Sequence, residues 1–162
     1  MEIYRVVLDI AGLNVYDIGT KFSNVLKKRY NMAEHFMEDV RLRIDNTLLS
    51  RKGAVFVCSN VVNAHDWYQK IDANQHLNYY VYKLSCDGHI QWHNSVFYES
   101  VFLSYYNRNR VDELLVFSRR ENAEKYWTTE IEQDDSKAEG LFWGEAKILE
   151  RTHYDCFQKV IL

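Results

Sequence analysis

Arg5, Ser59 and Glu139 each lie inside or at one end of a short apolar run of the sequence. Such runs are typical of buried strands, where an ionic or hydroxyl group costs desolvation energy unless it is paired or used. A guanidinium binds anions through forked hydrogen bonds, and a carboxylate can stabilise a developing positive charge. Because the three residues are far apart in sequence, they indicate a site that folding assembles.

The composition predicts one domain that spans residues 1–162. The chain is 47% hydrophobic and 15% aromatic, which is enough to bury a core. Its formal net charge of -3 lacks the basic bias of a dedicated duplex-binding protein. Three widely spaced cysteines are typical of free thiols in a reducing compartment. No run approaches the ~18 apolar residues that would cross a membrane, so we expect a cytoplasmic protein without a membrane partner.

The hydrophobic periodicity predicts an α+β fold, because strands and helices are interspersed with few clean βαβ units. Asp87 and Gly88 resemble a hairpin turn between two alternating segments. Asn60 stands where the N-cap of a short helix is expected. The predicted strands are 2–8, 54–58, 78–84, 89–93, 138–143 and 146–149. A helix is predicted at 31–49, and at least one of the helical patterns at 94–106 and 111–127 is expected to form a helix.

Several of these segments carry a shared pattern of short motifs. They are Tyr4-Arg5 in the first strand, residues 55–59 followed by Ala64 and Trp67, the tyrosine-rich residues 79–84, Ala123 with Tyr126-Trp127, and Glu139 with Gly144 five residues later. In this order the motifs resemble the ADP-ribosyltransferase superfamily, above all small bacterial and phage domains similar to the rifamycin ADP-ribosyltransferases. Each motif alone is short, and the resemblance covers most of the chain.

The resemblance implies split antiparallel or mixed sheets with flanking helices and a cleft that binds NAD. It also implies transfer of ADP-ribose to a protein or nucleic-acid acceptor with release of nicotinamide, as in a toxin or phage-conflict enzyme with a possible antitoxin. When the bond between ribose and nicotinamide breaks, a nearby carboxylate stabilises the oxocarbenium-like transition state. Glu139 is expected to be that carboxylate, and Glu145 is the alternative if the register is shifted.

The same resemblance assigns residues to NAD binding. Arg5 would hold a phosphate or ribose, although many relatives have His at this position. Ser59 would orient the glutamate or the nicotinamide ribose. Aromatic faces favour the cationic nicotinamide ring, and the aromatic residues expected to supply them are Tyr16, Phe22 and Tyr68.

Each assignment has a structural alternative. Arg5 fits an ion pair at the core edge, Ser59 fits a position before a helix cap, and Glu139 fits a solvated strand end. If these readings hold, the chain is a catalytically inactive domain of the same fold that binds a protein partner through its aromatic surface. The basic clusters at 27–29 and 51–52 leave a small nucleic-acid-binding module as a further alternative.

Two other groups of reactive residues are weaker. His89 and His93 on one strand would lie about 13 Å apart, too far to share a metal with Cys86, so we expect no metal site. Cys58 with His65 has the residue types of a nucleophile and base. Because Cys58 alternates with Phe56 as a core position, a buried inert thiol is expected.

Overall fold

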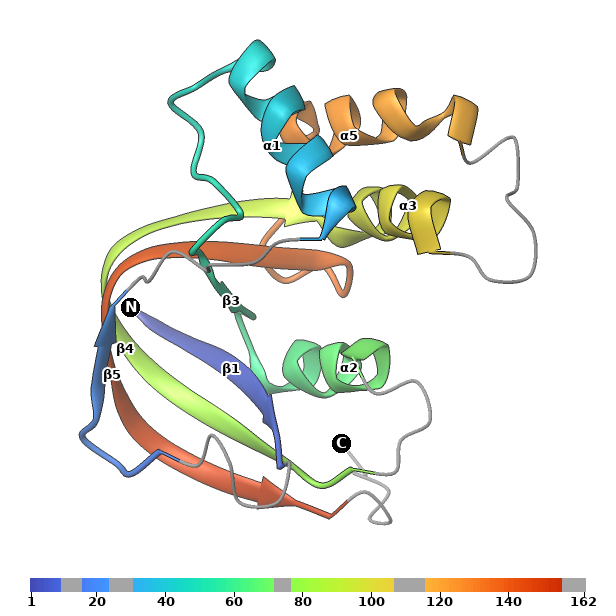
Figure 1. The fold of residues 1–162 in the computed structure, drawn as a ribbon. Coiled ribbons are helices and arrows are strands. Elements are labelled where there is room, and N and C mark those ends of the chain that lie inside the picture. Colours follow the sequence, from blue (N-terminus) through green and yellow to red (C-terminus); the bar gives the residue numbers. More distant parts are fainter. Residues whose placement is uncertain (10–15, 24–30, 72–76, 107–115, 156–162) are drawn as a thin grey trace.

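The computed structural model describes residues 1–9, 16–23, 31–71, 77–106 and 116–155 of the chain (Figure 1). Strands and helices are interspersed along it, and the strand pairs that the structure describes are antiparallel, so the α+β class is confirmed. The strands are β1 (Glu2–Leu8), β2 (Lys21–Ser23), β3 (Val55–Val57), β4 (Tyr79–Asn94) and β5 (Ala138–Tyr154), and the helices are α1 (Met32–Ile44), α2 (Val61–Ile71), α3 (Ser95–Tyr106) and α5 (Arg119–Thr128).

The two long strands β4 and β5 pair along their whole length and bend together (Figure 1). Gly88 and Gly144 face each other at this bend. A Cβ atom on either glycine would overlap with backbone atoms of the other strand, so this close approach requires glycine. The predicted hairpin turn at residues 87–88 is therefore wrong, because the chain bends there but continues as one strand. The two strands predicted over 138–149 are likewise one.

The strands close into a ring. β1 pairs with β4, β4 with β5, and β5 with β3. Cys58, which directly follows β3, then bonds back to Tyr4 of β1 through two backbone hydrogen bonds of 2.7 and 2.8 Å. The ring encloses a core that includes Ile3, Leu84 and Phe142. Short β2 adds to the free side of β5.

Three helices, α1, α3 and α5, lie together over one part of the sheet (Figure 1). Asn31 caps α1 by accepting a hydrogen bond from the Glu34 backbone N–H, as its sequence position favours. α1 ends at Ile44, before the predicted end at residue 49. Arg41 explains the early end, because its guanidinium donates to the carbonyls of Asn46 and Leu48 and holds the chain in a turn after the helix.

α2 covers a different part of the sheet and packs with Tyr4, Val81 and Tyr79. The Asn60 side chain accepts from the Asn63 N–H and caps this helix, so the predicted cap is confirmed. Among the helices that the structure describes, none is both long and apolar enough to span a membrane. The first strand and the helix at 95–106 match their predictions. Of the helix predicted at 111–127, residues 111–115 lie outside the described residues, and α5 confirms the helix over its second part.

Candidate functional site

A cavity of about 300 Å³ opens at one end of the strand ring. Strands β1, β4 and β5 supply one part of its wall, and the segment before β3 supplies another. The lining combines a guanidinium and two phenols with apolar side chains. Its residues are Arg5, Val7, Tyr16, Ser23, Gly53, Ala54, Val55, Tyr82, Leu84 and Ile148. Such a mixture of an apolar wall and a few polar groups is typical of small-ligand sites.

Arg5 and Tyr82 are direct cross-strand partners on β1 and β4. Directly opposed residues point to the same face of a sheet, so the guanidinium and the phenol enter the cavity side by side. Burial lowers the pKa of Arg5, while Tyr16 and Tyr82 act in the opposite direction. An arginine remains charged even so, and the cavity therefore presents a fixed positive charge.

Tyr16 belongs to a short strap, residues 16–20, that lies against the cavity. Its backbone N–H donates to the Tyr82 hydroxyl at 3.0 Å, and its carbonyl accepts from Arg151 at 3.1 Å. At the other end of the strap, two backbone hydrogen bonds join Gly19 and Thr20 to Ile148. The structure thus brings together two of the predicted NAD-binding residues, Arg5 and Tyr16.

The remaining predicted binding residues lie elsewhere. Ser59 donates to Asp134 at 2.8 Å in a surface loop and does not line the cavity. Tyr68 is buried in α2, stacks on Tyr79 with ring centroids 3.8 Å apart, and donates its hydroxyl to the Leu77 carbonyl. Phe22 lies in β2 opposite Ala146, and its side chain is outside the described part of the structure.

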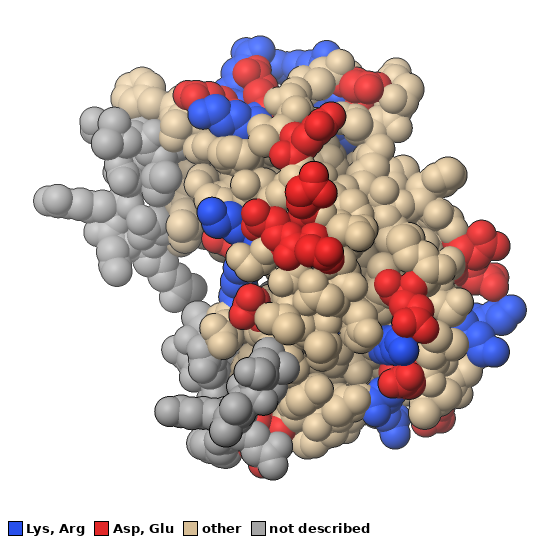
Figure 2. Space-filling model, turned by 180° about the vertical axis from the view of Figure 1, so that it is seen from behind, with Lys and Arg blue, Asp and Glu red and all other residues tan. Residues whose placement is uncertain are grey.

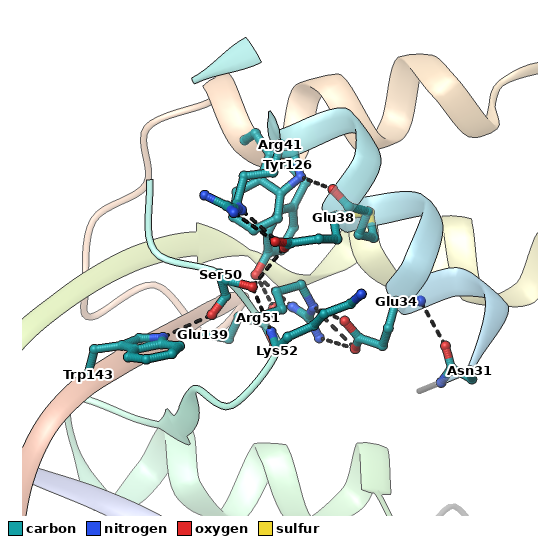
Figure 3. A network of polar contacts seen from close by, with 12 residues as sticks. Asn31, Glu34, Glu38, Arg41, Ser50, Arg51, Lys52, Tyr126, Glu139 and Trp143 are labelled. Atoms are coloured by element: carbon teal, nitrogen blue, oxygen red, sulfur yellow. Dashed lines mark hydrogen bonds and ion pairs between the residues drawn. The ribbon is translucent and has the colours of Figure 1, made fainter. Parts of the chain in front are cut away.

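Glu139 occupies a second polar centre, buried beneath the three-helix layer (Figure 3). Its side chain is only 1% exposed, and Arg51 forms an ion pair with its Oε1 atom. The Tyr126 hydroxyl accepts from Arg51 at 2.6 Å and donates to the same Oε1 at 2.5 Å. Glu34 pairs with the guanidinium from α1 at 3.1 Å. This arrangement links β5, α5 and α1 through one charge network.

The Arg51 charge is held firmly. Burial alone would lower the pKa of Arg51, but Glu139, Tyr126 and Glu34 outweigh it, and the pKa is raised. The Tyr98 ring lies against the guanidinium, with its centroid 3.6 Å from Cζ. The hypothesis that residues 51–52 form a basic surface cluster is therefore wrong for Arg51, which is 5% exposed. Residues 27–29 lie outside the described part.

Two buried atoms of this centre lack hydrogen-bond partners among the residues that the structure describes. They are Glu139 Oε2 and His93 Nε2. His93 is the cross-strand partner of Glu139, and its ring stacks on Tyr126 with a centroid separation of 4.6 Å. The Nδ1 atom lies 2.9 Å from the Tyr126 carbonyl and must donate, which leaves Nε2 as an acceptor in the neutral ring. Burial lowers the pKa of His93 to about 4.

Glu145, the alternative acid, lies on the surface with its side chain 62% exposed. It pairs with Lys21 at 3.3 Å and stands opposite Ser23, which lines the cavity. Glu139, in contrast, is not among the lining residues. Neither predicted acid is among the lining residues, and Glu145 is the one that pairs with a lining residue in the strand register.

Other predicted reactive groups are structural. Burial raises the pKa of the Cys58 thiol to about 12, which disfavours the reactive thiolate. His65 contacts the Tyr79 hydroxyl at 2.6 Å within an aromatic cluster. In the described ranges, no three His, Cys, Asp or Glu side chains come together as a metal site would need.

Charged side chains on the face shown in Figure 2 occur as small mixed groups, with acidic residues prominent in the middle. Apart from this view, the loop before β5 carries exposed acids, among them Glu130, Glu132 and Asp134. Where the structure describes this face, it offers no continuous basic surface for a nucleic-acid backbone.

Sequence reasoning did not find Tyr82, Arg51, Tyr126 or His93 as site residues. Tyr82 could have been found from its alternation with Val81 in a half-buried strand, because a phenol facing inward needs a polar neighbour. The partners of Glu139 had no comparable signal, since Arg51 lies 88 positions away in the chain.

Comparison with known families places the chain in one of them. Residues 9–154 match the family described as protein of unknown function (DUF2441). This range covers most of the chain, which therefore belongs to that family. Among curated proteins, no significant match was found.

Proposed function

We propose that this protein binds NAD in the cavity at Arg5 and transfers its ADP-ribose to a macromolecular acceptor. The observation that supports the proposal is the convergence of Arg5 and Tyr16, predicted from separate segments, on one cavity with a fixed positive charge. A guanidinium matches the oxygen geometry of a phosphate, and an aromatic ring favours the cationic nicotinamide. An ADP-ribosyltransferase-like fold is part of the same proposal.

The cavity volume of about 300 Å³ is at the lower end for ligand pockets. It would therefore take one half of the dinucleotide, and the other half would lie along the surface. In this arrangement Arg5 binds a phosphate, while the Val7, Leu84 and Ile148 side chains exclude water from the enclosed half.

The proposed acid is Glu145, because it stands opposite a residue of the cavity wall and its side chain is accessible. As nicotinamide leaves, positive charge develops on the ribose, and a carboxylate beside it lowers the barrier. Lys21 would have to release Glu145 for this role, which is inexpensive because exposed ion pairs contribute only about 0 to 1 kcal/mol. Glu139 acts as a structural partner of Arg51 in this proposal.

The test combines NAD binding with labelling of acceptors. Calorimetry should detect NAD binding to the wild type, a large loss in Arg5→Met, and little change in Lys83→Met. Lys83 is the matched control because it pairs with Glu2 and Glu150 and does not line the cavity. Glu145→Gln should retain NAD binding but lose labelling of lysate by isotopically labelled NAD. Undiminished labelling in Glu145→Gln would remove that residue from the reaction, and equal NAD binding by Arg5→Met would remove the site.

The second function is a catalytically inactive domain that binds a protein partner. It is favoured by one observation: neither predicted glutamate lines the cavity among the described residues. Several apolar side chains of α3 are also exposed, including Phe102, Leu103 and Tyr106. NAD binding without labelling of protein or nucleic acid would select this function.

A toxin role predicts that expression slows growth and that Glu145→Gln relieves the effect.

A further inference from the structure

The edge of β4 that faces away from β5 changes along the strand. β1 pairs with this edge only at residues 79–85 (Figure 1). The Cys86 N–H extends the contact by one bond of 3.2 Å to the Met1 carbonyl. Beyond that bond, none of the strands that the structure describes pairs with this edge, although β5 pairs with the other edge as far as Asn94. The second half of β4 therefore has an open edge.

The alternation of an antiparallel strand identifies the backbone groups on this open edge. The N–H and C=O of one residue point to the same neighbouring strand, and those of the next residue point to the other side. Cys86 points away from β5, and the β4–β5 register is continuous from there to the end of the strand. Ile90 and Trp92 therefore direct their N–H and C=O groups to the open edge, whereas Gln91 and His93 direct theirs to β5.

Two adjoining cavities lie along the open edge. One of about 310 Å³ is lined by residues 91–93, by residues 127–130 at the end of α5 and by Leu48. The other, of about 390 Å³, is lined by Trp92 and residues 130–132. Trp92 and Glu130 line both cavities, which together form a groove beside the strand. An open sheet edge with a groove beside it is the arrangement that binds an extended peptide as an added strand.

The charge of the groove selects the kind of peptide. Glu130 and Glu132 are exposed in its wall, and no Lys or Arg of the described ranges lines either cavity. The half-buried Trp92 indole belongs to the same wall, and indole rings attract cations. A second copy paired across a two-fold axis would bring both pairs of acids to one interface, where they would repel each other. The groove therefore matches a basic segment of another protein.

We propose that the open edge of β4 binds an extended, basic peptide segment of a protein partner. The segment pairs its backbone with Ile90 and Trp92, and its Lys or Arg side chains lie against Glu130 and Glu132. The inference goes beyond the proposed function, because none of these four residues lines the Arg5 cavity.

Hydrogen exchange tests the backbone pairing, with an acetylated and amidated octapeptide of alternating Lys and Thr as the probe. In the free protein, the Gln91 and His93 amides should exchange slowly because β5 accepts from them, and the Ile90 and Trp92 amides should exchange rapidly. At a saturating peptide concentration, exchange at Ile90 and Trp92 should slow by at least about tenfold. Gln91 and His93 are internal controls, because their amides face β5 in both states.

Charge substitutions test the side-chain pairing. The double variant Glu130→Gln and Glu132→Gln should weaken binding of the Lys–Thr octapeptide by roughly 3- to 30-fold at low salt. The matched control makes the same two changes at Glu121 and Glu124, which are exposed on α5 and do not line the groove. It should change the affinity by less than about twofold. An octapeptide of alternating Glu and Thr should bind the wild type at least about tenfold more weakly.

Four results would overturn the inference. They are unchanged exchange at Ile90 and Trp92 at millimolar peptide, slow exchange of both amides in the free monomer, protection that rises with protein concentration, and equal affinity for the two octapeptides. The second result would show that the chain itself covers the edge, and the third would assign the edge to a second copy. Because no arm of the experiment contains NAD, the inference and the proposed function can fail separately.

Discussion

Two polar regions of the molecule each combine an arginine with a tyrosine. In the buried centre, Arg51 and Tyr126 both bind the Glu139 carboxylate of the same chain. At the end of the strand ring, Arg5 and Tyr82 instead line a cavity. The same pair of side-chain types thus binds a buried carboxylate in one region and lines a cavity in the other.

The two regions also differ in what holds their polar groups. The buried centre joins β5 to α1 and α5, so its ion pair connects the sheet with the helical layer. The cavity lies within the ring, and its walls are held by backbone hydrogen bonds of the strands and of the strap. We infer that the first region maintains the fold and that the second, which lines a cavity, serves a ligand. Substitutions at matched positions can break or sharpen this distinction.

The largest expected effect is on the buried ion pair. Arg51→Met should lower the free energy of unfolding by about 3 to 5 kcal/mol, because Glu139 would remain as a buried charge without its partner. Arg5→Met is the matched substitution in the cavity, and it should cost much less. Urea unfolding of both variants measures the difference. Equal losses in the two variants would contradict the division into a structural and a ligand-binding arginine.

The lowered pKa of His93 predicts that the stability of the fold depends on pH. Its pKa is about 4 in the folded protein and 6.5 when unperturbed, so only the unfolded state binds a proton between these values. The free energy of unfolding is therefore unaffected by His93 above pH 6.5. It decreases as the pH falls from 6.5 to 4, by roughly 3 kcal/mol in total. His93→Phe should flatten this part of the stability profile. A slope that persists unchanged in His93→Phe would assign the effect to other groups.

The bend that separates the two regions depends on the pair Gly88 and Gly144. Gly88→Ala should destabilise the fold by about 1 to 3 kcal/mol, because the added methyl group overlaps with the backbone of β5. Gly19→Ala is a useful comparison, since Gly19 has a positive φ of 89° but no atoms within 4 Å of the added group. Thermal unfolding should place Gly88→Ala below Gly19→Ala. The reverse order would show that the bend tolerates a side chain.

The smallest expected effect concerns the exposed pair of Lys21 and Glu145. Its atoms lie 3.3 Å apart, but both side chains are more than 60% exposed. Glu145→Gln should therefore change the free energy of unfolding by less than about 1 kcal/mol. A loss as large as that of Arg51→Met, measured in the same urea series, would give Glu145 a structural role and weaken its assignment as the acid.

The sequence predicted the local features better than the long-range ones. The cap at Asn60 depends on neighbouring residues, so its side-chain type was sufficient to indicate a helix start. The sequence Asp87-Gly88 was interpreted as a hairpin turn, but the same residue types also occur where a continuous strand bends. The pairing of Gly88 with Gly144 on β5 shows that this site is a bend. Arg5 and Tyr16 were predicted as site residues and both line the cavity, whereas the position of Tyr82 beside Arg5 required the register of β1 and β4. The partners of Glu139, which are Arg51 and Tyr126, lie in other elements of the chain, so the spacing of residues in the sequence could not predict them.

The most direct test of the ligand-binding region is a crystal structure of the protein soaked with NAD at a saturating concentration. We predict density for a phosphate at the Arg5 guanidinium in the cavity, with the Arg51 and Glu139 pair unchanged. NAD bound at another surface, or an empty cavity in crystals that leave it accessible, would contradict the assignment of this cavity as the functional site.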